Sequence, residues 1–176
     1  MSYEWEEDAN KPEEYHQVEV ERGREFILRL TTGADIVKAL EKFAIDNEIR
    51  FAKIHAAFMG GLEPARFLVW APDTEDPENW HNEEPMEIQN LSMLLSMSGI
   101  IHPRPTDEGE KPCPAIHFVI GGGWNVPTDG GHLLEGSIVK GVVELFVTEI
   151  EGIDVMYPEG TQPEEDFPEN WYKETG

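Results

Sequence analysis

Two histidines, His117 and His132, are the side chains of this sequence best suited to chemistry. His132 follows a glycine pair, Gly130 and Gly131, and His117 lies upstream on an apolar, strand-like run. An imidazole can ligate a metal, exchange a proton near neutral pH or hold a hydrogen bond. Glycines allow the backbone to approach another segment closely. We therefore expect His132 in apolar surroundings, either as a structural residue or as a ligand.

A zinc site at these residues needs a third protein ligand, because even catalytic zinc sites keep three. The candidate is His55 on a neighbouring predicted strand, so the predicted metal ligands are His117, His132 and His55. Residues two apart on a strand share a face and can chelate, but Ala115 and Val119 occupy those positions around His117. The pattern favours hydrogen-bonded structural roles for His117 and His132, with metal binding as the alternative.

Other reactive groups are weaker candidates. Glu135 and Glu144 can serve as ligands, as ordinary exposed strand residues or as partners for a buried histidine. His102 lies in a proline-rich segment that nothing fixes near the others. Cys113 lies between two prolines, with no evident basic neighbour to lower its pKa, and is a poor nucleophile. The glycine run at 121–123 lacks the ending of a phosphate-binding loop and predicts a tight turn.

The charge balance limits the partners of the chain. Its 176 residues contain 36 Asp and Glu against 13 Lys and Arg, a net charge of −23. Nucleic-acid binding depends on basic contacts that release counterions, so this balance argues against it. No apolar run is long enough to span a membrane, and the N-terminal residues are acidic rather than signal-like. With a single cysteine, no internal disulfide forms, and a cytoplasmic protein is expected.

Hydrophobic periodicity predicts one clear helix among many strands. The helix is expected after a cap at Thr31 or Thr32, with a stop near Asn47. Strands are predicted at 15–30, 50–58, 63–71, 86–98, 115–120 and 133–150, with bends at Gly136 and Gly141. Loops are predicted at 72–85 and 101–114, which are rich in proline and polar residues. These elements form one domain at 15–152, between an acidic arm at 1–14 and an acidic tail at 153–176.

The order of these segments resembles the plants-and-prokaryotes-conserved (PPC) domain, also known as DUF296. The resemblance rests on the ordered set Phe26-Ile27-Leu28-Arg29-Leu30, Phe58-Met59-Gly60-Gly61-Leu62, Met86-Glu87-Ile88-Gln89-Asn90-Leu91 and Gly130-Gly131-His132-Leu133-Leu134-Glu135-Gly136. It covers about residues 16 to 151.

The resemblance implies an α/β (α+β) fold, in which a single domain has a curved, largely antiparallel β-sheet packed by one main helix. It also implies a homotrimer whose glycine-rich edges meet between subunits. Gly130, Gly131, His132, Leu133 and Glu135 are then the fold and interface motif.

Three functions are compatible with this resemblance. The first is a non-catalytic homotrimer that acts as an assembly and protein-interaction module with an inter-subunit cleft. The second is a zinc-dependent small-molecule binder or enzyme that resembles acetolactate decarboxylase and uses His55, His117 and His132. Many prokaryotic relatives carry a His-x-His pair facing the Gly-Gly-His histidine, and this chain keeps one histidine of that pair. The third is a DNA-binding protein, as relatives are often labelled, and the charge of −23 opposes it.

Overall fold

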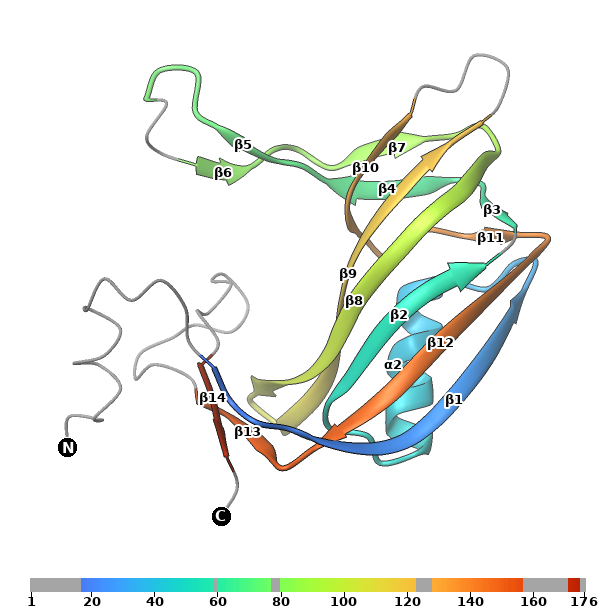
Figure 1. Cartoon of the computed structure of the whole chain (residues 1–176). Coiled ribbons are helices and arrows are strands. Elements are labelled where there is room, and N and C mark those ends of the chain that lie inside the picture. The colour runs from blue at the N-terminus through green and yellow to red at the C-terminus, as the bar shows by residue number, and fades with distance from the viewer. Residues whose placement is uncertain (1–16, 59, 77–79, 123–127, 157–170, 175–176) are drawn as a thin grey trace.

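One amphipathic helix packs against a curved antiparallel sheet in the computed structural model of the chain (Figure 1). The structure describes residues 17–58, 60–76, 80–122, 128–156 and 171–174, and the predicted arm at 1–14 lies outside them. The predicted α+β class and the largely antiparallel sheet with one helix are confirmed over the described residues. In this part of the chain no helix is long and apolar enough to cross a membrane.

The main sheet has ten strands in the order β1-β12-β2-β8-β9-β10-β4-β7, with β3 and β11 attached beside this path. The elements are β1 (Glu21–Thr31), α2 (Ile36–Asp46), β2 (Ala52–Phe58), β3 (Gly61–Leu62), β4 (Ala65–Leu68), β5 (Trp70–Pro72), β6 (Trp80–Asn82), β7 (Met86–Ile88), β8 (Ser92–Thr106), β9 (Gly109–Gly121), β10 (Asp129–Leu133), β11 (Val139–Lys140), β12 (Val142–Glu151), β13 (Ile153–Met156) and β14 (Trp171–Glu174). The pairs β5–β6 and β13–β14 form two small separate sheets.

The helix covers one face of the main sheet, and we call the other face the open face. In α2 the residues Ile36, Leu40 and Ala44 are buried, spaced as one stripe of a helix. They belong to the same core cluster as Ile54 of β2 and Leu145 of β12. Because successive strand residues point to opposite faces, the residues that alternate with this core lie on the open face. The residues on the open face are therefore the ones available to bind a ligand or a partner.

The helix begins one turn later than the threonines predicted. Asp35 is the N-cap, and its Oδ1 accepts hydrogen bonds from the backbone N–H groups of Val37 and Lys38 at 3.0 and 3.2 Å. The prediction of Thr31 or Thr32 as the cap was wrong because both residues are engaged with β12 or the turn before it. Thr31 pairs with Val142, and the Thr32 hydroxyl bonds to the backbone of Gly141.

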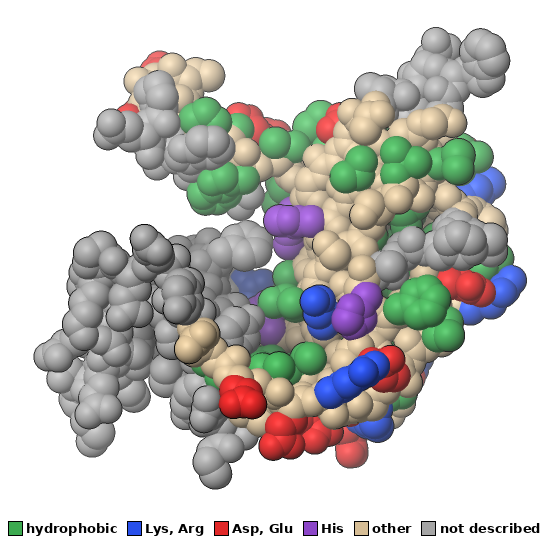
Figure 2. All heavy atoms as spheres, in the orientation of Figure 1, with side chains coloured by type: hydrophobic (Ala, Val, Ile, Leu, Met, Phe, Trp, Pro, Cys, Tyr) green, Lys and Arg blue, Asp and Glu red, His purple; other side chains and the backbone are tan. Residues whose placement is uncertain are grey.

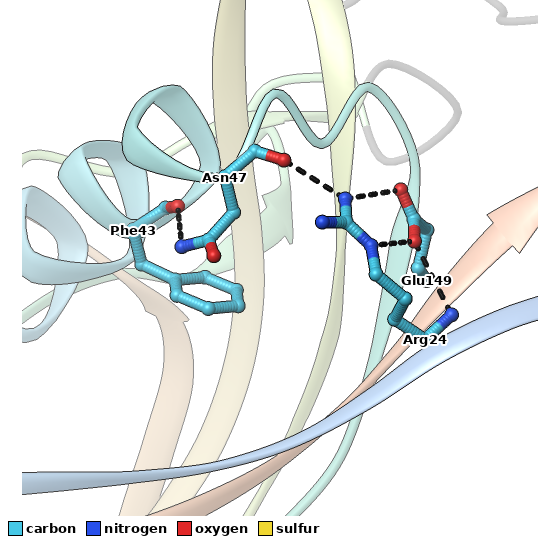
Figure 3. Close-up of polar contacts among 4 residues, drawn as sticks. All are labelled: Arg24, Phe43, Asn47 and Glu149. Carbon is cyan, nitrogen blue, oxygen red and sulfur yellow. Dashed lines mark hydrogen bonds and ion pairs between the residues drawn. The ribbon is translucent and has the colours of Figure 1, made fainter.

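An arginine–glutamate pair joins the end of the helix to the sheet (Figure 3). The Arg24 guanidinium donates to both carboxylate oxygens of Glu149, at 2.6 and 2.9 Å, and also to the backbone oxygen of Asn47 at 2.8 Å. Asn47 caps the helix by donating from its side chain to the Phe43 carbonyl at 2.9 Å. Hydrogen bonding from Arg24 lowers the pKa of Glu149, which is almost fully buried. This charge-assisted, bidentate contact fixes the position of the end of α2 relative to β1 and β12.

The predicted loop at 101–114 is instead a long hairpin, and that prediction was wrong. β8 and β9 pair from Met93↔Gly121 to Thr106↔Gly109, including Pro103 opposite Pro112. A proline cannot donate to the ladder, but antiparallel residues alternate between hydrogen-bonded and non-bonded pairs. Prolines at alternating positions can therefore all occupy non-bonded pairs without losing a ladder bond.

Several other boundaries differ from the sequence expectation. The strand predicted at 86–98 is divided into β7 and β8, and the one at 133–150 is divided among β10, β11 and β12. The bends predicted at Gly136 and Gly141 are confirmed, with φ of 89° and 82°. The loop predicted at 72–85 contains β6, which pairs with β5, and the tail predicted from 153 contains β13 and β14.

Candidate functional site

A row of polar side chains crosses the open face perpendicular to the strands. It consists of Glu25, Thr148, His55, Ser98, His117 and His132, and we call it the polar row. Glu25 pairs with Thr148, Ser98 pairs with His117, and His117 pairs with His132. Extending the pair Ile54↔Gly99 by one residue places His55 opposite Ser98. On β2 the register partner of Thr148 is Lys53, and a hydrogen bond links Thr148 to His55 instead. Because directly paired residues on neighbouring strands share a face, these pairs and that bond make the row continuous from β1 to β10.

One end of the polar row is a chain of hydrogen bonds. The Glu25 Oε1 atom accepts from Arg22 at 2.8 Å and from the Thr148 hydroxyl at 2.7 Å. These two bonds, that of Thr148 first, lower the pKa of Glu25, so the carboxylate is an acceptor only. Since Thr148 uses its one proton on Glu25, its oxygen must accept from the Nε2–H of His55, 2.6 Å away.

Replacing Thr148 with valine should break this chain while keeping the side-chain shape. Thr148 is buried, and we expect Thr148→Val to destabilise the protein by about 1 kcal/mol and to expose the His55 Nε2 proton to rapid exchange. Urea unfolding and the imidazole resonances of His55 measure both effects. The exposed Thr31 is the control, because Thr31→Val at the end of β1 should change stability by less than about 0.5 kcal/mol. Equal effects of the two substitutions would contradict the hydrogen-bond chain.

At the other end of the polar row, His117 and His132 lie side by side. Their ring centroids are 5.5 Å apart and the rings are nearly perpendicular. His117 is exposed and His132 is partly buried. Burial, and then the charge of His117, lower the pKa of His132, which keeps that imidazole neutral near physiological pH. An imidazole nitrogen can ligate a metal, so the two residues can supply two ligands.

The third predicted ligand is not close to this pair. His55 is two strands away from His117, and neighbouring strands lie about 4.8 Å apart, so the two backbones are separated by about 10 Å. Within the described part of the chain, no group of three His, Cys, Asp or Glu residues could hold a metal ion. The donor chemistry fits zinc, but these residues supply two ligands where a protein zinc site uses at least three.

The glycine motif has a packing role that follows from the position of β10 between β9 and β4. A Cβ on Gly130 would lie 2.1 Å from the carbonyl oxygen of Phe118, and one on Gly131 would lie 2.3 Å from that of Leu68. Leu133 is buried beside them. The motif therefore holds His132 against β9, as the sequence predicted for close backbone approach.

The rest of the motif contacts the helix. The backbone N–H of Gly136 donates to Asp35 Oδ2 at 2.7 Å, so the helix cap also fixes the end of the motif. Glu135 is exposed and forms an ion pair with Lys38. The second carboxylate candidate, Glu144, forms an ion pair with Arg29. Both carboxylates thus have cationic partners away from the histidine pair.

Cys113 and His102 pair with each other at the far end of the β8–β9 hairpin, away from the polar row. Burial raises the pKa of the Cys113 thiol, so it is a poor nucleophile as expected, but for another reason than the predicted lack of basic neighbours, because Arg104 and Lys111 both act to lower that pKa. His102 is buried, and its Nδ1–H donates to the Pro103 carbonyl at 3.0 Å. Desolvation lowers the pKa of His102 despite that hydrogen bond.

The buried His102 predicts a loss of stability in mild acid. Its pKa is about 6.5 in the unfolded chain and lower in the folded protein, so protons bind preferentially to the unfolded state as the pH falls below about 6.5. Stability from this residue is complete above that pH and decreases below it. His102→Asn keeps a donor near the Nδ1 position without titrating. We expect the stability difference between about pH 8 and pH 5.5, measured by urea unfolding, to be smaller in the variant; identical differences would contradict this.

An exposed apolar patch lies beside the polar row on the same face. Its members are Ile27, Met93, Leu95, Val119 and Phe146, all exposed. Figure 2 shows hydrophobic and histidine side chains on the face turned toward the viewer, with α2 behind the sheet in Figure 1. Along β12 the open-face residues run from Phe146 in the patch through Thr148 in the polar row to Ile150. The open face is thus divided into zones by the polar row.

The family model for the Plants and Prokaryotes Conserved (PCC) domain matches residues 17–151. The chain therefore belongs to the plants-and-prokaryotes-conserved family, as its motif order predicted. No curated protein matches the chain.

Solved structures share the fold. A plant- and prokaryote-conserved protein from Pyrococcus horikoshii matches with a TM-score of 0.65 and 20% identity, covering 84% of this chain and 92% of that chain. A metal-containing protein from Archaeoglobus fulgidus matches with a TM-score of 0.61 and 28% identity, covering 84% and 95%. A protein described as a putative DNA-binding protein from Bacteroides thetaiotaomicron has a TM-score of 0.60 and 21% identity, covering 88% and 96%.

Sequence reasoning found His117, His132 and the glycine motif but missed Glu25 and Thr148. Glu25 and Thr148 are 123 positions apart, and only the β1–β12 register brings them together. Alternation within the strand at 133–150 could have assigned Thr148 to the face opposite Val147, yet it carries no information on cross-strand partners.

Proposed function

We propose that this protein is a non-catalytic homotrimer of PPC domains that acts as an assembly and protein-interaction module with an inter-subunit cleft. The observation that supports the proposal most strongly is the apolar patch. Ile27 is 68% exposed and Leu95 is 51% exposed, although both lie on a sheet face rather than on a loop. Exposed apolar side chains gathered on one sheet face are typical of a protein–protein interface. A cyclic assembly would cover it in every subunit.

Sedimentation velocity on the untagged chain tests the assembly. A trimer has about three times the 20.0 kDa mass of one chain, and a species near 20.0 kDa at micromolar concentration would overturn the proposal.

Each chain carries a net charge of −23, so association works against mutual repulsion. Added salt screens that repulsion, and we expect the trimer to become tighter as ionic strength rises. Dissociation by salt would indicate that ion pairs rather than apolar contacts hold the subunits.

The second candidate is a metal-dependent small-molecule binder. Two observations favour it: the pairing of His117 with His132, and the relative from Archaeoglobus fulgidus, which is described as metal-containing and is 28% identical. His55 is the predicted third ligand. In this candidate function it must approach the pair, or another donor must replace it.

Metal analysis of purified, untagged protein, together with thermal melts in the presence and absence of chelator, separates the two candidates. If the histidines are structural, chelator leaves the melting temperature of the parent unchanged, while His117→Ala and His132→Ala each lower it. If they are ligands, chelator lowers the melting temperature of the parent, and loss of either histidine abolishes metal binding. We expect melting that is insensitive to chelator. If chelator greatly lowered the melting temperature of the parent but not that of the histidine variants, the metal-dependent function would become the leading candidate.

Direct nucleic-acid binding is not part of the proposal, although some structural relatives carry DNA-binding descriptions. Those relatives are 21% identical, a level at which the likeness concerns the fold. Most basic side chains that the structure describes are already in ion pairs with carboxylates: Arg22, Arg24, Arg29, Lys38, Lys42, Arg50, Arg66, Lys111 and Lys140. With a net charge of −23, we expect no binding to duplex DNA in an anisotropy titration at physiological salt.

A further inference from the structure

An apolar pocket opens beside the polar row, on the side away from the apolar patch. Its volume is about 520 Å³, which is within the range of small-molecule sites. Val20, Phe51, Ile100, Ile150 and Ile153 contribute its apolar lining. It lies where the residues before β1, the strands β2 and β8, and the junction of β12 with β13 come together. Ser98 belongs to both the pocket and the polar row, so the two are contiguous.

One cation lies in this apolar lining. Lys53 is exposed on β2, where it pairs with Thr148 on one side and Ile100 on the other. Carboxylates outnumber basic residues by 36 to 13 in this chain. Lys53 nevertheless forms no ion pair with any residue that the structure describes. The same is true of Arg104. Among the described residues, the Lys53 ammonium group thus has no carboxylate partner, and the side chain belongs to the lining of a hydrophobic pocket.

We propose that this pocket binds an amphipathic monocarboxylate, whose apolar body packs against Ile100, Ile150 and Val20 and whose carboxylate meets Lys53. The apolar lining supplies affinity by removing hydrocarbon from water, and the Lys53 ammonium supplies charge complementarity. The Ser98 hydroxyl offers a second donor to the same carboxylate. A polyanion such as a nucleotide fits poorly, because the net charge of −23 repels each added negative charge and Lys53 is the one cation among the lining residues that the structure describes.

Titration of the full-length chain with octanoate, followed by calorimetry and by amide chemical shifts, tests this site. We expect octanoate to bind with shifts at Lys53, Ser98 and Ile100. Acetate has the carboxylate without the hydrocarbon chain, and octylamine has the hydrocarbon chain with a positive charge in place of the carboxylate. Both should therefore bind much more weakly than octanoate. Absence of octanoate binding to the parent overturns the proposal.

Two variants and one matched control sharpen the test. Lys53→Gln keeps much of the aliphatic stem and should weaken octanoate binding about tenfold, the effect of losing one charge-assisted hydrogen bond. Ile100→Asp places a carboxylate in the lining and should abolish binding. Lys42→Gln removes a lysine from α2, where it pairs with Asp46, and should leave the affinity unchanged. Unchanged affinity in Lys53→Gln, or equal binding of octylamine, overturns the assignment of a carboxylate ligand.

Discussion

Replacing Gly130 with alanine should destabilise the domain by about 3 kcal/mol or more. The added methyl carbon would lie 2.1 Å from the carbonyl oxygen of Phe118, which is backbone and cannot rotate away. Relief requires β10 to move off β9, which breaks the pairing of Gly130 with Val119 and displaces His132 from His117. The effect is steric, so it should appear in the unfolding free energy and in the imidazole resonances of both histidines.

Gly33→Ala is the matched control for this prediction. Gly33 has a φ of 93°, but no atom lies within 4 Å of a Cβ built there. Its substitution should cost only the strain of a left-handed conformation, about 1–2 kcal/mol. Urea unfolding at one fixed protein concentration compares the two variants, because the stability of an oligomer depends on concentration. A cost for Gly130→Ala no larger than that for Gly33→Ala would show that β10 does not approach β9 this closely.

Much of the fold was predictable because its signals are local. The stripe Ile36, Leu40 and Ala44 identified the helix, and Gly136 and Gly141 marked real bends. The failures arose where pairing overrides local composition. Prolines at alternate positions such as Pro103 and Pro112 suggested a loop, yet they face each other in a hairpin. Likewise Asp35 caps the helix because Thr31 is already paired in β1.

The candidate site was predictable only in its residue types. His117 and His132 were expected to meet, and cross-strand pairing does bring them together. The distance of His55 from them depends on the strand order β2-β8-β9-β10, which places β8 between β2 and β9. Strand order between segments far apart in sequence is not encoded in periodicity. For the same reason Lys53 and its apolar surroundings could not be assembled from the sequence.

Replacing Phe146 with aspartate should convert the proposed trimer into a folded monomer. Phe146 is paired with Ile27 across β1 and β12, and both side chains are exposed on the open face of one subunit. If the apolar patch is the subunit interface, the substitution buries an unpaired carboxylate at every copy of that interface. Such a change costs several kcal/mol per site, which weakens association by at least about 100-fold.

The matched control uses an apolar residue on the other side of the molecule. Ile45 is 54% exposed on α2, the helix that covers the face opposite the patch. Ile45→Asp adds the same charge, so any general effect of a more acidic chain appears in both variants. We expect sedimentation to return a mass near 20.0 kDa for Phe146→Asp and the parent mass for Ile45→Asp, with unchanged circular dichroism in both. If Phe146→Asp remained a trimer, the apolar patch would not be the subunit interface. Octanoate binding retained in the monomer would show that the Lys53 pocket belongs to a single subunit.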